Sequence, residues 1–278
     1  MTHAAIATDQ PRLTFGGEVR SEWIKLRSLR STVWCYVIIL VAQVGLGLLV
    51  AGDAASATGR SHTAQQAFVV VVATSGVLFG QLVSSVLGAL IITGEYGTGM
   101  IRSTFAAVPK RLPALLAKGL VFGVVTFVVG LVGILLTLLA TAGILAGHGY
   151  GIDLGDGHLW LALLGAAGYL ALVGLIAFAL GAIVRNSAGG IAAALGLLLV
   201  LPIVLSIVTG ASSPVWLRNV GEFVPSVAGE HMADYVAGPV RAVAGVVTLL
   251  PWQGLLVMLA WVAVLSAVAA VLVRRRDA

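Results

Sequence analysis

Six long apolar stretches alternate with shorter polar segments along the chain. Each is roughly 20 residues or longer and lacks Asp, Glu, Lys and Arg, which suits a helix that crosses a hydrocarbon layer of about 30 Å. Unpaired backbone groups are costly in lipid, so such stretches fold as helices. The pattern therefore predicts an all-α integral membrane protein with membrane-spanning helices at residues 33–51, 67–92, 119–147, 159–184, 188–209 and 252–273.

Composition supports the same class of protein. Charged residues make up 10% of the chain, whereas a soluble domain carries about 25%. The 35 glycines are typical of membrane helices whose backbones approach closely. The net charge of +5 comes from residues that flank the apolar stretches and form no basic domain, which argues against a nucleic-acid partner.

The distribution of Lys and Arg predicts the orientation. Thirteen of the 16 lie in the two terminal segments and in the second and fourth connections, and three lie in the other connections. Basic residues favour the cytoplasmic side, so both chain ends are predicted to be cytoplasmic in a multi-pass protein of the cell membrane. The fourth connection, residues 185–187, is short enough to be a tight turn.

The chain divides into a predicted disordered tail, residues 1–16, and a single transmembrane domain, residues 17–278. The fifth connection, 210–251, is moderately apolar, carries four prolines and is too broken to span a membrane. We interpret it as short re-entrant helices that dip into the outer leaflet under protein cover.

The segment before the first span is amphipathic. Val19, Trp23 and Leu26 recur at i, i+4 and i+7, while Arg27 and most other basic residues lie elsewhere. This spacing predicts an interfacial helix with tryptophan at the headgroup level and basic groups toward anionic lipid. The alternative is a positive flank that only sets topology.

Polar side chains in the spans allow two interpretations. The third span carries a stripe of small residues that includes Thr126 and Thr137, and the second span carries Gln81 and Ser85 on roughly one face. Small residues at this spacing form close helix contacts, and a glutamine in a membrane needs a partner. These residues either pack the helices together or line a pathway.

The sequence contains no catalytic signature. It has no Gly-rich phosphate loop with a following Lys, no metal-ligand motif and no nucleophile motif, so we expect no catalytic residue, no metal site and no cofactor on this chain. The spans also lack the charges that ion-driven transporters use. Uphill transport would therefore draw its energy from another polypeptide. Two rivals remain, a secondary transporter and a non-transporting membrane anchor or assembly factor.

The connection after the second span has features of a docking element. Glycines interrupt the span, and a short helix is predicted from Thr98 to before Pro109, where the proline ring ends it. Glu95 is the only acidic residue of this connection and is expected to pair with a nearby Lys or Arg or to cap the helix. The residues expected to contact a partner are Met100, Ile101, Arg102 and Phe105. The alternative is a basic loop with no further role.

Three segments together resemble permeases of the type-2 ATP-binding-cassette (ABC) exporter family, in a subfamily common in actinobacteria. They read VRSEWIKLRSLRSTVW before the first span, TGEYGTGMIRSTFAAVPKR after the second, and VRRRDA at the end. The resemblance covers essentially the whole chain. It implies a connecting helix from Glu18 to Leu29, a cytoplasmic coupling helix from Thr98 to Val108, and a match of Glu95 to the glutamate that commonly precedes the coupling helix.

The resemblance also implies function and partners. The chain would be the permease subunit of a bacterial exporter, without an ATPase site of its own. It would pair with a second permease copy and with a separate ATPase subunit that binds ATP and Mg. The uncharged spans favour an apolar or amphipathic substrate such as a drug, a peptide antibiotic or a lipid.

Overall fold

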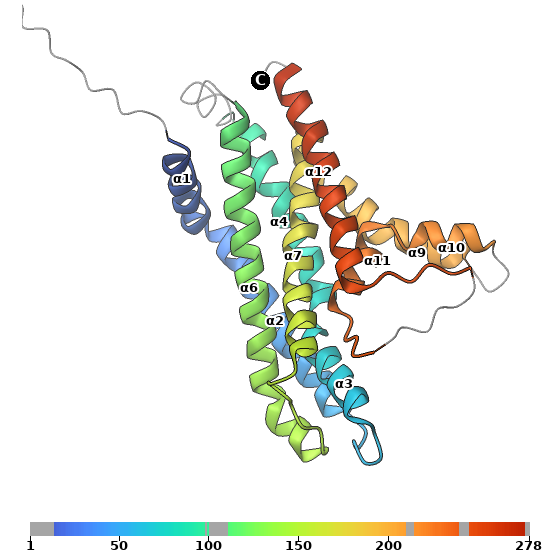
Figure 1. The fold of residues 1–278 in the computed structure, drawn as a ribbon. Coiled ribbons are helices and arrows are strands. Elements are labelled where there is room, and N and C mark those ends of the chain that lie inside the picture. The colour runs from blue at the N-terminus through green and yellow to red at the C-terminus, as the bar shows by residue number, and fades with distance from the viewer. Residues whose placement is uncertain (1–13, 98, 100–110, 210–213, 239–244, 276–278) are drawn as a thin grey trace, which may run out of the picture.

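The computed structural model describes residues 14–97, 99, 111–209, 214–238 and 245–275, and every regular element among them is a helix. The helices form one elongated bundle (Figure 1). Six helical stretches are long and apolar enough to cross a membrane, which confirms the predicted fold class and number of spans. They are Arg30–Gly52, His62–Gly97, Leu112–Gly147, Gly157–Val184, Ser187–Val208 and Pro251–Arg275.

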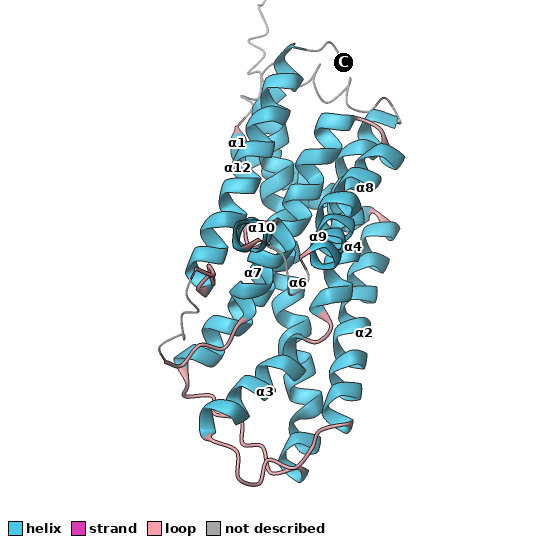
Figure 2. Ribbon diagram, turned by 90° about the vertical axis from the view of Figure 1, so that its right-hand side faces the viewer, coloured by secondary structure: helices cyan, strands magenta, loops and turns pink. Residues whose placement is uncertain are grey.

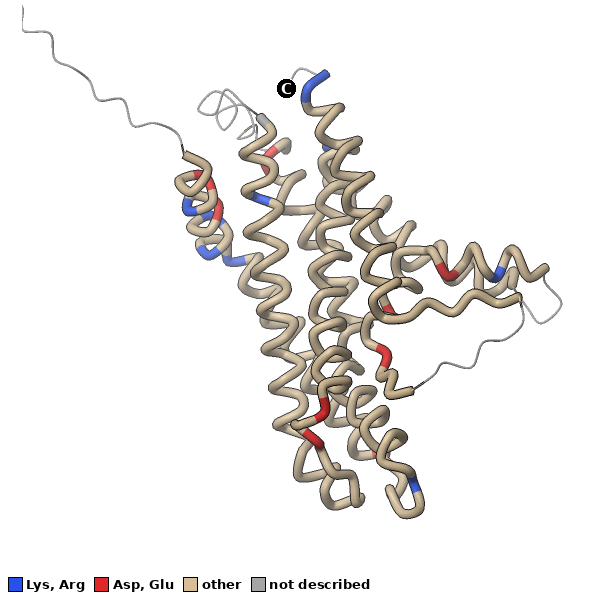
Figure 3. Tube along the Cα trace, in the orientation of Figure 1, with Lys and Arg blue, Asp and Glu red and all other residues tan. Residues whose placement is uncertain are grey.

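Most Lys and Arg residues gather at one end of the molecule (Figure 3). This end, called the basic end below, holds helix α1 (Phe15–Ser28), the end of α4 (Val77–Gly97), the start of α6 (Arg111–Gly147) and the end of α12 (Pro251–Arg275). An excess of basic groups at one end is what the predicted orientation requires.

Helix α7 (Gly157–Val184) forms the centre of the bundle and is buried along most of its length. It packs against α4, α6 and α12. Alternating small residues let α4 and α7 touch backbone to backbone, with Gly88 against the carbonyl oxygen of Gly174. Ser84 Oγ also donates a hydrogen bond of 2.9 Å to Leu170 O of α7. Small side chains and a hydrogen bond to a carbonyl are both common in membrane helix contacts.

The second span is broken, which the sequence pattern did not predict. Helix α3 (His62–Thr74) ends before a turn at Ser75 and Gly76, and α4 follows. At this turn α2 (Arg30–Gly52) crosses so closely that a Cβ atom at Gly76 would overlap the backbone of Gln43.

The turn between the fourth and fifth spans is as tight as predicted. Helix α7 ends at Arg185, which adopts the left-handed conformation with φ 59°. Asn186 then caps α8 (Ser187–Leu195), its side chain accepting from Gly189 N at 3.0 Å. An Asn cap supplies the acceptor that the first turn of a helix lacks.

The fifth span bends before it ends. Helix α8 continues into a π-helical turn, η1 (Gly196–Val200), and then α9 (Leu201–Val208). Pro202 lies just after this turn; it has no backbone N–H and its ring displaces the preceding turn, so the wider π turn accommodates it. Helices α9 and α10 (Val215–Gly221) then project sideways from the bundle (Figures 1 and 2).

Short helices occupy the fifth connection, as expected. Helix α11 (Pro225–Glu230) and the 3-10 turn η2 (His231–Ala233) pack against α7, with Gly229 against the Tyr169 ring. Tyr169 lies 12 residues after the first residue of α7, about 18 Å along a helix that rises 1.5 Å per residue. That they enter the membrane from the outer side remains a prediction.

Cysteine labelling tests the orientation. In a Cys35→Ser background, cysteines at Ser61 or Gly155, both exposed at the end opposite the basic end, should react with an impermeant maleimide added to intact cells. A cysteine at Ser28, exposed at the end of α1, should react only after the cells are opened. Labelling of the Ser28 site in intact cells would reverse the topology.

Candidate functional site

Four charged side chains meet in a largely buried group at the basic end. This basic-end cluster comprises Glu22 and Lys25 of α1, Glu95 of α4 and Lys118 of α6. Lys25 Nζ lies 2.8 Å from Glu22 Oε1, and Lys118 Nζ lies 2.8 Å from Glu95 Oε1. Lys118 also bonds Glu22 Oε2, and Lys25 lies 3.5 Å from Glu95. Acids and bases therefore alternate around a closed ring that joins three helices.

Local sequence places each member of the cluster. Thr14 caps α1 by accepting from Gly17 N at 3.3 Å, which starts the helix two residues before the predicted boundary at residue 17. Glu22 then points inward from α1 at an i, i+3 spacing to Lys25. Glu95 lies in the last turn of α4, and Lys118 lies two turns into α6, so both face the same level of the bundle.

Burial makes this cluster electrostatically strong. The side chains of Glu22, Glu95 and Lys118 are 7%, 5% and 9% exposed, while that of Lys25 is 33% exposed. Desolvation alone would lower the pKa of Lys25, but the hydrogen bond to Glu22 and the negative charges of Glu22 and Glu95 raise it above the ordinary lysine value. Charges taken out of water are stable only when paired in this way.

A cavity of about 500 Å³ adjoins the cluster, between α1, α4 and α6. Both acids and both lysines of the cluster line it, together with apolar residues such as Leu26 and Ile91. Helix α1 is therefore held against the bundle mainly through charged groups at the edge of a cavity, and only its half-buried Leu26 packs on the nearby apolar core.

The structure describes only one of the five residues predicted to contact the ATPase, Glu95. Met100, Ile101, Arg102 and Phe105, and nearly all of the predicted coupling helix from Thr98 to Val108, lie outside the described residues. Glu95 lies inside them, and its contacts with Lys118 and Lys25 match the predicted pairing with a nearby basic residue.

A helix is present where the connecting helix was predicted, and its position at the membrane interface remains a prediction. Val19 and Leu26 are half-buried, whereas Trp23 is 46% exposed and points away from the bundle with Ile24. Arg27 is exposed as well. Glu22 lies on the face of α1 that meets the bundle, where Lys118 of α6 pairs with it.

Sequence reasoning did not single out Glu22, Lys25 or Lys118. One signal was available: Glu22 is an acid among five basic residues of the N-terminal segment, and Lys118 directly precedes the third apolar stretch. Their meeting depends on how α1 folds back against α6, and no local pattern encodes that.

The polar residues of the spans make helix contacts in this structure. Tyr36 of α2 and Thr126 of α6 share a hydrogen bond of 3.0 Å, and Thr137 packs on Gly47 of α2. The Tyr169 hydroxyl donates to Gln81 Oε1. A separate bond joins Ser85 Oγ to the Gln81 carbonyl oxygen at 2.6 Å. Among Gln81, Ser85, Thr126 and Thr137, Gln81 also borders one of the two cavities described in the next paragraph.

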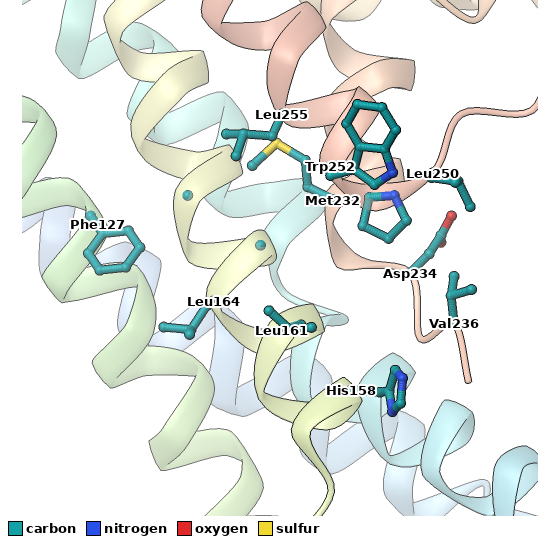
Figure 4. Close-up of a pocket in the computed structure, with 13 residues that line it drawn as sticks. Phe127, His158, Leu161, Leu164, Met232, Asp234, Val236, Leu250, Trp252 and Leu255 are labelled. Atoms are coloured by element: carbon teal, nitrogen blue, oxygen red, sulfur yellow. The ribbon is translucent and has the colours of Figure 1, made fainter. Parts of the chain in front are cut away.

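Two cavities lie on either side of the segment that follows α11. The first, called the apolar cavity, measures about 550 Å³ and is lined by α6, α7 and the start of α12. Figure 4 shows Leu161, Leu164, Met232 and Trp252 around it, with Asp234 at its edge. The second, called the mixed cavity, measures about 640 Å³ and lies between the α3–α4 break, Tyr169 and Glu230.

Comparison with known proteins decides the family. The family model described as ABC-2 family transporter protein matches residues 19–203, which is two thirds of the chain. The chain belongs to the ABC-2 transporter family. It is therefore a multi-pass membrane protein and a transport component, as the resemblance implied. No curated protein matches it.

The ABC-2 match begins at Val19, inside α1, and ends inside α9. It thus includes all four members of the basic-end cluster and the segment 98–110. Two of the three helices that carry the cluster, α4 and α6, flank this segment, and ion pairs join both of them to α1.

Proposed function

We propose that this ABC-2 protein is the membrane-spanning permease subunit of an ATP-driven exporter. It forms the translocation path and receives energy from a separate ATPase subunit that binds ATP and Mg. The observation that carries this proposal is the ABC-2 family match over residues 19–203. The absence of a phosphate loop from the sequence supports a separate ATPase.

Transmission of ATPase movement would pass through the basic end. The segment 98–110 connects α4 to α6, and the cluster ties both of these helices to α1. Buried ion pairs with several partners hold helices in one arrangement, because an alternative one leaves charges unpaired. A push on the segment would then move α1, α4 and α6 together.

The proposed second permease copy, the orientation and the substrate class are supported by the outer surface and one cavity of the bundle. Large apolar side chains are exposed on every long helix, which suits lipid or a second permease copy. The basic end faces the cytoplasm of a bacterial cell in this proposal. The apolar cavity of Figure 4 supports export of an apolar or amphipathic substrate.

Coupled ATP hydrolysis tests the proposal. The full chain is purified together with a candidate ATPase subunit, and Phe105→Ala is compared with the wild type at equal complex yield. We expect a loss of at least about tenfold in substrate-stimulated hydrolysis, since a docking side chain of this size contributes roughly 1–2 kcal/mol or more at an interface.

The matched control is Phe79→Ala, which makes the same change at a position of α4 that is 52% exposed toward the lipid side of the bundle. It should leave hydrolysis unchanged. Wild-type hydrolysis in Phe105→Ala would remove the segment 98–110 from the transmission path. Failure of the chain to form a complex with any ATPase would overturn the permease assignment itself.

A further inference from the structure

The mixed cavity combines apolar walls with two carboxylates, Glu230 and Asp234, of which Asp234 is already paired with His231. Val70, Val71 and Leu78 line it on one side and Leu249 on the other. Glu230, the last residue of α11, borders it and is exposed. A concave apolar surface with a few placed polar groups is the usual form of a small-molecule site.

Glu230 has no hydrogen-bond or ion-pair partner among the described residues. The neighbouring His231 balances the charge of Glu230 only in part, because both of its ring nitrogens are hydrogen-bonded elsewhere, one to Asp234 and one to Glu222, at 2.8 Å each. These two acids raise the pKa of His231 to about 9 despite its partial burial, so its positive charge is already shared between them.

The other polar groups of the cavity are largely satisfied. Tyr169 and Gln81 bond one another, and the Thr74 and Ser75 hydroxyls donate to backbone carbonyl oxygens of α3. Desolvation raises the pKa of Glu230 and the negative charge of Asp234 raises it further, whereas the positive charge of His231 offsets part of this effect. A ligand that complements this cavity would therefore carry a positive charge on an otherwise apolar molecule.

We propose that the mixed cavity is a binding site for an amphipathic organic cation, with Glu230 opposite the positive charge and the valine and leucine side chains around the apolar part. Binding alone is a property of this cavity. That the bound cation is exported rests on the proposed function, and it narrows the substrate class from apolar or amphipathic molecules to cationic ones.

Two ions of equal shape and opposite charge test the site. The full chain in lipid nanodiscs is titrated with tetraphenylphosphonium and with tetraphenylborate, and binding to protein-free nanodiscs is subtracted. We expect saturable binding of tetraphenylphosphonium, with about fivefold weaker affinity in Glu230→Gln, because one partly solvated charge pair contributes up to about that factor. Tetraphenylborate should show no saturable binding.

Two further variants locate the effect. Asp53→Asn removes an exposed carboxylate outside the cavity and should leave affinity unchanged. Ala67→Trp fills the cavity from α3 without altering charge and should also weaken binding. Equal binding of both ions, or wild-type affinity in Glu230→Gln or Ala67→Trp, would overturn the site. None of these outcomes affects the permease proposal, which the ATPase complex and Phe105→Ala test separately.

Discussion

Replacing Lys118 by methionine is expected to destabilise the protein strongly, by about 3–5 kcal/mol, because it leaves the carboxylates of Glu22 and Glu95 buried without their shared cation. The measurement is thermal or denaturant unfolding of the purified chain in nanodiscs. Limited trypsin digestion gives a second reading, since α1 carries Arg20 and Arg27 and should be released from the bundle.

Lys25→Met is the matched control for this prediction. The Lys25 side chain is 33% exposed and its contact with Glu95 is longer, at 3.5 Å, so its loss should cost about 1 kcal/mol or less. Combining Lys118→Met with Glu22→Gln and Glu95→Gln should recover much of the lost stability, because the one charge left in the cluster is that of Lys25, which is 33% exposed and can be solvated. Equal effects of the two lysine variants would mean that the cluster does not hold α1.

The second large effect is expected from Gly88→Ala. A methyl group at this position would overlap the carbonyl oxygen of Gly174, so α4 and α7 must separate along a closely packed seam of the bundle. Overpacking of this kind costs about 1–3 kcal/mol, and here backbone rather than a side chain has to move. We expect a lower melting temperature and a reduced yield of folded protein.

Gly45→Ala on α2 provides the comparison, because a Cβ atom there has nothing within 4 Å. It should be neutral or stabilising by up to about 1 kcal/mol, which is the gain in helix propensity. A melting temperature for Gly88→Ala equal to that of Gly45→Ala would show that α4 and α7 do not touch at this seam.

The number of spans and the class of fold followed from local chemistry alone. A run of uncharged apolar residues has one stable form in lipid, so six runs predict six helices without knowledge of their contacts. The same reasoning predicted the tight turn at Arg185 and Asn186, because a charged residue and a helix-capping residue between two apolar runs leave little other choice. The family also followed from the sequence, because the segments around the first and second spans resemble those of type-2 ABC permeases and the family model matches residues 19–203.

The contacts that matter for function depended on tertiary structure. Gly76 meets the backbone of Gln43 because α2 crosses there, and Gly133 and Thr137 of α6 contact α2 only in the folded bundle. Glu95 stood out in the sequence, but Glu22 and Lys118 lie 73 and 23 residues away from it along the chain.

The sequence by itself therefore determined which segments lie in lipid and which in water, since hydropathy is a property of the residues in each segment. Only the folded bundle decided which polar groups meet, because a buried charge selects its partner by position in space. The ring of Glu22, Lys25, Glu95 and Lys118 exists because α1 lies against α6, and Glu230 has no direct ion-pair partner because His231 pairs with two other acids.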